Sequence, residues 1–459
     1  MKKILPIFFI FHFSFFISQA QDYQDIDSLK NILASTPAFN GTDADTTRMK
    51  LCIDIGQLYQ KTNLDSAFWW YNSVADTLFN ANNTKQYPGK ATQNANALYY
   101  MGIVAYYQRT YQVAVYYWEQ SLKIREELGD KMGTSSCLNN LGIGYSHLGD
   151  YPKSTDYYKK SLEKAEALGD RQGISASLMN LGVVYFDQGD YPKASEYYEK
   201  SLKTKEELGD RRGISSCLNN LGLVYSDKGD YPKSMDYYEK SLKIAETLGD
   251  KPCISRCLMN LGIVYKNQGC YPKATEYYEK SMKIYGELGD KLGISRCLNN
   301  LGIVFYYQGD DSKATVYYEK SLKIKEELGD RLGISSSLLN LGNVYKNQGD
   351  YQNATAFYEK SLKIVEELGD KQGISNCLNN LAGVYQNQGN FPKATEYYEK
   401  CLKIYEELGT LANLALYYPA LSRMYSIVKE PNKAMPLYQR SRQITISLLK
   451  NNFSILSEK

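Results

Sequence analysis

Seven asparagines recur along the chain at intervals of forty residues, each immediately before a leucine. A side-chain amide carries both hydrogen-bond donors and an acceptor, so a row of amides matches the backbone of an extended peptide whatever its sequence. The same amides could instead bond to the neighbouring repeat and hold the repeats together, and the sequence leaves both roles open. The asparagines are Asn140, Asn180, Asn220, Asn260, Asn300, Asn340 and Asn380.

The residue before each of these asparagines alternates between polar and apolar types. An extended peptide would meet amide and apolar positions in turn, although duplication of a two-repeat unit of eighty residues explains the alternation more simply. The series reads Asn139, Met179, Asn219, Met259, Asn299, Leu339 and Asn379.

Basic residues occur in the middle of the series at positions that are small or polar in other repeats. Arg256 and Arg296 occupy the repeat position of Ser136. Lys266 and Lys346 occupy the position of Ser146, which lies ten residues later in the repeat. Because opposite charges complement each other across a recognition surface, we predict that the partner segment is acidic there or carries a free carboxylate.

No arrangement typical of catalysis or cofactor binding occurs. The chain has two histidines, His12 and His147, and the position of His147 varies between repeats, which predicts a surface residue. There is no glycine-rich phosphate loop and no CxxC pair, so we predict a non-catalytic protein without cofactor or metal. The 54 basic and 51 acidic residues give a net charge of +3, which argues against nucleic acid as a partner.

The nine cysteines follow the repeat rather than a disulfide framework. Equivalent positions in packed helical layers lie about 10 Å apart, beyond the roughly 7 Å over which two Cα atoms can be bridged. We therefore predict small, buried or half-buried free thiols. Five of the cysteines share one repeat position: Cys137, Cys217, Cys257, Cys297 and Cys377.

Residues 131–410 align as seven consecutive blocks of forty without a gap, which indicates a solenoid of stacked units rather than separate globular domains. Each block predicts two helices. In the first block Asp130 caps a helix that runs to about Leu148, and Gly149-Asp150 interrupts the chain. Pro152 then lies in the first turn of the second helix, which Gly169 ends in the left-handed conformation.

The block resembles the tetratricopeptide repeat. Leu138 takes the place of the family's tryptophan, Leu141-Gly142 and Tyr145 match its Leu-Gly and Tyr, and Tyr158 takes the place of its second-helix Phe. The final proline of the motif is missing, and six extra residues lengthen each unit. This long form is similar to the repeats of the animal spindle-orientation adaptors, which grip extended peptides.

The resemblance implies an all-α, right-handed superhelical α-solenoid of tandem helix-turn-helix repeats, in which the first helices line a concave groove. It places both series of asparagines on that groove, together with Arg256 and Arg296. On this basis the first expectation is a scaffold that binds peptide or protein segments in the groove.

The ends of the chain depart from the regular repeat. Residues 1–20 begin with Lys2 and Lys3, continue with an apolar run and end in small residues, which predicts a secretory signal peptide and export to the periplasm, the cell surface or the medium. We expect a linker over 81–96. The remaining segments are divergent N-terminal helices and a first helix pair over 21–90, a degenerate repeat over 91–130, a C-terminal capping repeat over 411–450 and a tail over 451–459.

Residues 446–459 are similar to the stretch that leads into a caspase-like peptidase domain in bacterial repeat–CHAT proteins. This similarity suggests one alternative function, the sensor arm of a peptidase that is carried elsewhere. A second alternative is a self-associating structural spacer. The sequence leaves the oligomeric state open.

Overall fold

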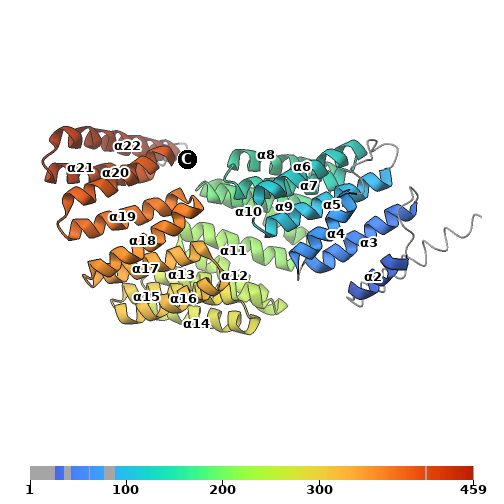
Figure 1. Cartoon of the computed structure of the whole chain (residues 1–459), viewed down its shortest axis with the longest axis horizontal. Helices are drawn as coiled ribbons and strands as arrows, with labels where there is room; N and C mark the ends of the chain where they lie inside the picture. Colours follow the sequence, from blue (N-terminus) through green and yellow to red (C-terminus); the bar gives the residue numbers. More distant parts are fainter. Residues whose placement is uncertain (1–25, 36–42, 61–62, 77–87, 409–410, 458–459) are drawn as a thin grey trace, which may run out of the picture. The chain divides into compact units, whose positions relative to one another are not determined.

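The computed structural model describes residues 26–35, 43–60, 63–76, 88–408 and 411–457, and every regular element in these ranges is an α-helix (Figure 1). The segment predicted to be a signal peptide, residues 1–20, lies outside the described residues. The helices are α2 (Ile26–Ser35), α3 (Asp43–Gln60), α4 (Leu64–Asp76), α5 (Pro88–Tyr107), α6 (Tyr111–Leu128), α7 (Lys131–His147), α8 (Tyr151–Leu168), α9 (Arg171–Asp187), α10 (Tyr191–Leu208), α11 (Arg211–Asp227), α12 (Tyr231–Leu248), α13 (Lys251–Asn267), α14 (Tyr271–Leu288), α15 (Lys291–Tyr307), α16 (Asp311–Leu328), α17 (Arg331–Asn347), α18 (Tyr351–Leu368), α19 (Lys371–Asn387), α20 (Phe391–Leu408), α21 (Leu411–Ile427) and α22 (Pro431–Ser457).

Within each of the chain's two compact units, consecutive helices from α3 onward pair into hairpins, and successive hairpins pack on one another. We call the odd-numbered helix of each pair the first helix and the even-numbered one the second helix. The chain forms two compact units, one ending at Ser241 and the other beginning at Leu242, within α12. The predicted all-α solenoid of tandem helix-turn-helix repeats is confirmed.

Most helices of the regular repeats begin where an aspartate accepts a backbone hydrogen bond. The Asp130 carboxylate accepts from the Gly133 N–H at 2.9 Å, and Asp150 caps α8 in the same way, as predicted. Gly149 and Gly169 adopt the left-handed φ angles of 76° and 67° that the connections require. Cys270 replaces the aspartate before α14 and makes no capping hydrogen bond with its side chain.

In the hairpins from α3–α4 to α17–α18, the first and second helices approach closely where a glycine faces an aromatic ring. A Cβ atom at Gly142 would lie 2.6 Å from the Tyr158 ring, so only glycine fits there. The Tyr158 ring also contacts the next hairpin, where Leu181 and Val184 pack against it. One aromatic side chain therefore joins two successive hairpins.

The last regular hairpin departs from this rule. Ala382 replaces the glycine, and Gly383 follows it. The opposing Tyr398 is 9% exposed, whereas Tyr358 in the preceding hairpin is 0% exposed. A Cβ atom at Gly383 would have no neighbour within 4 Å, so this glycine makes no close contact.

Buried serines link three consecutive helices at the junctions between hairpins. The Ser121 hydroxyl donates to the Ala95 carbonyl oxygen at 2.7 Å and accepts from the Cys137 thiol at 3.4 Å. All nine cysteines are free, and only Cys270 is exposed, so the prediction of free thiols is confirmed. The same junction recurs with Ser201 and Cys217 in the first unit and with Ser281 and Cys297 in the second.

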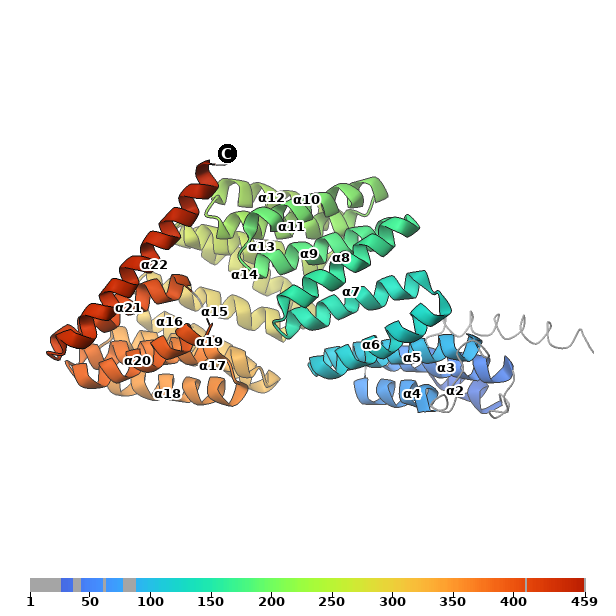
Figure 2. The ribbon, with the colours of Figure 1, turned by 90° about the horizontal axis from the view of Figure 1, so that it is seen from above.

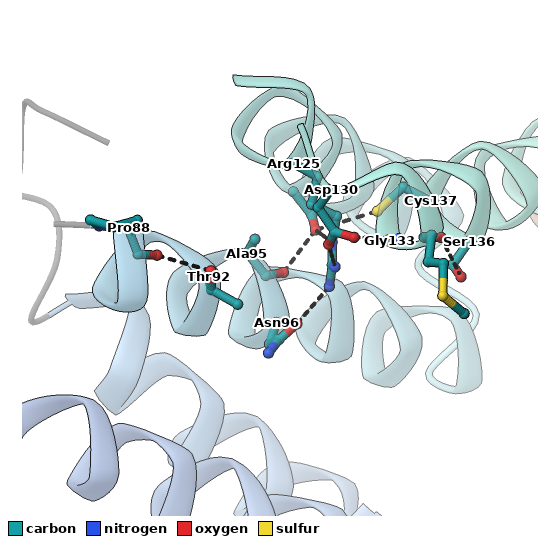
Figure 3. A network of polar contacts seen from close by, with 11 residues as sticks. Pro88, Thr92, Ala95, Asn96, Arg125, Asp130, Gly133, Ser136 and Cys137 are labelled. Carbon is teal, nitrogen blue, oxygen red and sulfur yellow. Dashed lines mark hydrogen bonds and ion pairs between the residues drawn. The ribbon is translucent and has the colours of Figure 1, made fainter. Parts of the chain in front are cut away.

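At the first of these junctions a buried arginine adds further bonds (Figure 3). The Arg125 guanidinium pairs with Asp130 at 2.5 Å, donates to the Asn96 amide oxygen at 2.6 Å and donates to the Ser121 hydroxyl at 3.2 Å. A buried charge is tolerated only when its donors are paired in this way. Arg125 therefore joins α5 and α6 to the N-terminus of α7.

The N-terminal part of the first unit is helical further than expected. The predicted linker over 81–96 is wrong for residues 88–96, because α5 begins at Pro88. Proline fits the first helical turn, where its missing N–H would have no partner anyway.

Helix α2 precedes the α3–α4 hairpin in the chain. Its Leu29 and Leu33 are buried in the same core as Met49 of α3, so α2 covers this first hairpin.

We expect Gly342→Ala and Gly383→Ala to shift the free energy of unfolding in opposite directions. At Gly342 a Cβ atom would lie 2.5 Å from the Tyr358 ring, and overpacking of this kind costs about 1–3 kcal/mol. At Gly383 the methyl group meets open space, and the higher helix propensity of alanine contributes about 0.5–1 kcal/mol. Denaturant unfolding followed by circular dichroism measures both changes. A Gly342→Ala protein as stable as the unsubstituted chain would contradict the close packing described here.

Candidate functional site on the inner face of the first helices

The first helices of successive hairpins lie against one another within each unit. In the first unit α7 contacts α9, and in the second unit α13, α15, α17 and α19 contact each other in turn. Successive first helices therefore touch one another, in addition to the more extensive packing of each second helix on the next first helix. We call this side of each unit the inner face, and define it by the first-helix positions of Ser136, Asn139, Asn140, Ile143 and Ser146 and their equivalents. By helical periodicity these positions lie opposite the buried Leu138 and Leu141.

The asparagines form hydrogen bonds between repeats along this face. The Asn180 side chain donates to the Asn139 amide oxygen at 3.0 Å, and Asn340 donates to the Asn299 amide oxygen at 3.0 Å. Each bond joins residues 41 apart, so it spans two neighbouring first helices. The sequence left the role of these amides open, and in the structure Asn180 and Asn340 bond to the neighbouring repeat.

These bonds leave part of each amide pair unused. In the pair formed by Asn139 and Asn180, the Asn139 amino group and the Asn180 carbonyl oxygen have no partner among the described residues. An amino group and a carbonyl oxygen therefore stay available at each such pair. Of the predicted site residues, Asn219 and Asn260 are buried, Arg256 and Arg296 are exposed, and the following are half-buried: Asn139, Asn140, Asn180, Asn220, Asn299, Asn300, Asn340, Asn379 and Asn380.

Apolar side chains separate the amide pairs. Asn220 donates to the Met179 sulfur at 3.2 Å, so methionine takes the place of the accepting asparagine in this repeat. Three residues after the amides, Ile143 is half-buried and Val183 is 37% exposed. The inner face of the first unit therefore alternates amide and apolar positions, as the sequence indicated.

Four basic side chains lie on the inner face of the second unit. The exposed Arg256 makes a long contact of 3.6 Å from its guanidinium to the Cys253 sulfur. Lys266 and Lys346 are half-buried, and burial lowers the pKa of both ammonium groups. Neither lysine has an acidic partner within the described residues of the chain.

At the end of the inner face of the first unit, beside Tyr106, lies a cluster that sequence reasoning missed. His147 was predicted to be an ordinary surface residue. It is exposed, but its Nε2 atom lies 3.0 Å from the Tyr106 hydroxyl, and its ring stacks on Tyr111 with 4.7 Å between ring centroids. Burial lowers the pKa of His147, while the nearby Asp187 acts in the opposite direction. The signal in the sequence was the spacing of 36 residues between the stacked rings, which recurs between Tyr271 and Tyr307.

The described residues hold no cluster of three histidine, cysteine, aspartate or glutamate side chains arranged to bind a metal ion. None of the described helices is both long and apolar enough to cross a bilayer.

Comparison with known proteins identifies the repeat. The family model described as tetratricopeptide repeat matches residues 93–167, 173–247, 254–327, 333–407 and 373–447, which together cover most of the chain. No curated protein matches the chain.

Solved structures share the fold at low sequence identity. The apo quorum sensor NprR from B. thuringiensis is 16% identical, with a TM-score of 0.51 over 79% of this chain and 99% of NprR. A Rap protein complexed with competence and sporulation factor is also 16% identical, with a TM-score of 0.50 over 78% of this chain and 99% of that one.

A signal-transduction ATPase with a tetratricopeptide repeat sensor, from Pyrococcus horikoshii, is 13% identical. Its TM-score is 0.52 over 93% of this chain and 69% of that one. At these identities the similarity shows the fold alone. Together with the matching repeat model, the hairpin geometry shows that this chain belongs to the tetratricopeptide repeat family.

Proposed function

We propose that this chain is a non-catalytic scaffold that binds extended peptide or protein segments on its inner face, and that the segment bound by the second unit is acidic. The proposal rests on two features that occur together on the inner face. One is the amide pair whose hydrogen-bonding groups are partly unused, and the other is the set of basic side chains without acidic partners. In the second unit these are the pair Asn299–Asn340 and the cations Arg256, Lys266, Arg296 and Lys346.

The physical mechanism is preorganisation. Because Asn299 and Asn340 already hold each other across two repeats, little entropy of these side chains remains to be lost when a ligand binds. The backbone of an extended segment would pair with the free donors and acceptors, and its carboxylates would meet the guanidinium and ammonium groups. The Rap protein in complex with competence and sporulation factor supports this proposal by fold similarity.

Removing both exposed guanidinium groups is expected to weaken binding of an acidic peptide. The probe is a fluorescein-labelled peptide of alternating leucine and glutamate, compared with its leucine–lysine counterpart by fluorescence anisotropy. Two exposed charge pairs contribute up to about 1 kcal/mol each, so Arg256→Ala with Arg296→Ala should weaken binding about tenfold at low salt.

The matched control removes two positive charges from second helices, with Lys323→Ala and Lys363→Ala, both exposed. This control should bind the glutamate peptide as the unsubstituted chain does. Binding that ignores both added salt and the arginine substitutions would contradict the acidic-ligand proposal.

The half-buried Lys266 and Lys346 predict a pH dependence of the same binding. A carboxylate pairs with the ammonium form, so the ligand raises the pKa that burial has lowered in the free protein. Affinity should therefore fall as pH rises through that lowered pKa, starting below the ordinary lysine value of about 10.4. Arginine stays charged throughout this range, so Lys266→Arg with Lys346→Arg should remove the dependence. Anisotropy titrations at a series of pH values measure it, and an unchanged pH profile in the arginine variant would exclude these lysines as the cause.

We also propose that the chain is exported through residues 1–20. Their basic start, apolar run and small-residue end support this proposal. When the full chain is produced in a bacterial host, the recovered protein should begin at Gln21, as read by N-terminal sequencing. Ala20→Arg should block cleavage, because the processing site takes small residues. An intact Met1 in the unsubstituted protein would contradict export by this route.

The alternative function as the sensor arm of a caspase-like peptidase stays a prediction. Of the segment on which it rests, residues 446–457 belong to α22, and residues 458–459 lie outside the described residues.

A further inference from the structure

Two carboxylates lie at the end of the inner face of the first unit, where the second unit carries uncharged residues. Asp187 and Asp227 are the last residues of α9 and α11, which follow α7 in the teal-to-green part of the ribbon (Figure 2). Both side chains are exposed. The equivalent residues of the regular hairpins in the second unit are Asn267, Tyr307, Asn347 and Asn387. The two acidic residues therefore distinguish the first unit from the second.

The position of these carboxylates is electrostatically unfavourable in the free protein. The C-terminal end of a helix carries a partial negative charge, so it favours cations and disfavours acidic side chains. Partial burial raises the pKa of both carboxyls, and at Asp227 burial is the sole cause of the shift. A positive charge brought close to either residue would relieve this unfavourable interaction.

No cation among the described residues of the first unit neutralises Asp187 by an ion pair. The charged neighbour that acts on Asp187 is His147, which opposes the rise of the Asp187 pKa. Burial lowers the pKa of His147 itself, so its imidazole is mostly uncharged at neutral pH. The inner-face positions of α7, α9 and α11 include no lysine or arginine. The negative charge of Asp187 is therefore available to a ligand.

A buried tyrosine hydroxyl lies beside this carboxylate. Tyr198 of α10 is 3% exposed; burial raises its pKa, and the Asp187 charge adds to the rise, so the two groups are near each other. The equivalent hydroxyl of Tyr398 reaches the inner face, where it donates to the Gln386 amide oxygen at 3.2 Å. The residue of α9 equivalent to Gln386 is Phe186, which cannot accept this bond. The Tyr198 hydroxyl consequently has no hydrogen-bond partner among the described residues.

We propose that Asp187, Asp227 and the Tyr198 hydroxyl bind cationic side chains, so that the first unit takes a basic segment. This inference rests on the proposed function of the inner face and specifies the ligand of the first unit. A protonated amine carries several N–H donors, which can pair with a carboxylate and with the lone pairs of a tyrosine hydroxyl at the same time. Charge complementarity therefore selects a basic segment here, in contrast to the acidic segment proposed for the second unit.

Binding of the fluorescein-labelled leucine–lysine peptide to the full chain tests this proposal by fluorescence anisotropy at low salt. Asp187→Asn with Asp227→Asn should weaken binding about tenfold, because two exposed charge pairs are lost. The matched control is Glu166→Gln with Glu206→Gln, which removes two exposed negative charges from second helices of the same unit. The control should bind the lysine peptide as the unsubstituted chain does. The asparagine substitutions should not weaken binding of the leucine–glutamate peptide.

The outcomes separate this inference from the proposed function. Absence of lysine-peptide binding, or an equal loss in the asparagine and glutamine variants, would overturn the cation site even if the glutamate peptide binds. The asparagine variant should also melt at or above the temperature of the unsubstituted chain, because acidic side chains are removed from helix C-termini. A lower melting temperature would mean that the carboxylates are already paired in the free protein, and would overturn the proposal as well.

A second comparison tests the hydroxyl. Tyr198→Phe keeps the ring that packs against Gly182 and should weaken lysine-peptide binding about threefold or more, because one hydrogen bond to the amine is lost. A leucine–trimethyllysine peptide keeps the charge but has no N–H donor on its side chains, so Tyr198→Phe should leave its affinity unchanged. The control is Tyr318→Phe, at the equivalent position of the second unit, where the tyrosine is 2% exposed. Equal effects of Tyr198→Phe on the two peptides, or equal effects of the two phenylalanine variants, would overturn the role of the hydroxyl.

Discussion

The close approach of an aromatic ring to a helical glycine is the contact on which the rest of this structure depends. With Tyr158 pressed against Gly142, the two helices of a hairpin come near enough for the ring to reach the next hairpin as well. The same side chain therefore sets the distance within a hairpin and the distance between hairpins. Where Ala382 replaces the glycine, Tyr398 is less completely buried, but the hairpin is retained. A repeated contact of this kind is what allows near-identical units to stack in series.

The buried serines at the junctions between hairpins fix the rotation of each first helix about its own axis. Because Ser121 bonds to a carbonyl of one first helix and a thiol of the next, the buried side of both helices is specified. The opposite side must then present the asparagines, and residues 41 apart in the sequence come within hydrogen-bonding distance. Structural and recognition roles of these amides are therefore compatible: one part of each pair holds the repeats together, and the other part is available to a ligand.

The two units use the same scaffold with different chemistry on the inner face. The first unit carries His147 hydrogen-bonded to Tyr106 and stacked on Tyr111. The second carries exposed arginines and half-buried lysines that lack acidic partners. The inner-face positions differ between repeats, whereas the Gly–Tyr contact recurs in the hairpins before Ala382 and the Ser–Cys contact recurs at several junctions. The repeated fold thus combines a largely uniform core with a varied surface.

The amino-acid sequence by itself determined the forty-residue hairpin, the capping aspartates, the left-handed glycines, the free thiols and the placement of the asparagines and arginines on first helices. These follow from local preferences and from the repeat, which require no knowledge of distant contacts. Only the tertiary structure decided that Asn180 bonds to Asn139, that Lys266 and Lys346 are half-buried, and that His147 meets Tyr106 and Tyr111. It also decided that Tyr438, in the predicted capping repeat, is exposed. Burial and pairing depend on which helix lies alongside, and that neighbour is set by stacking rather than by the residues adjacent in the chain.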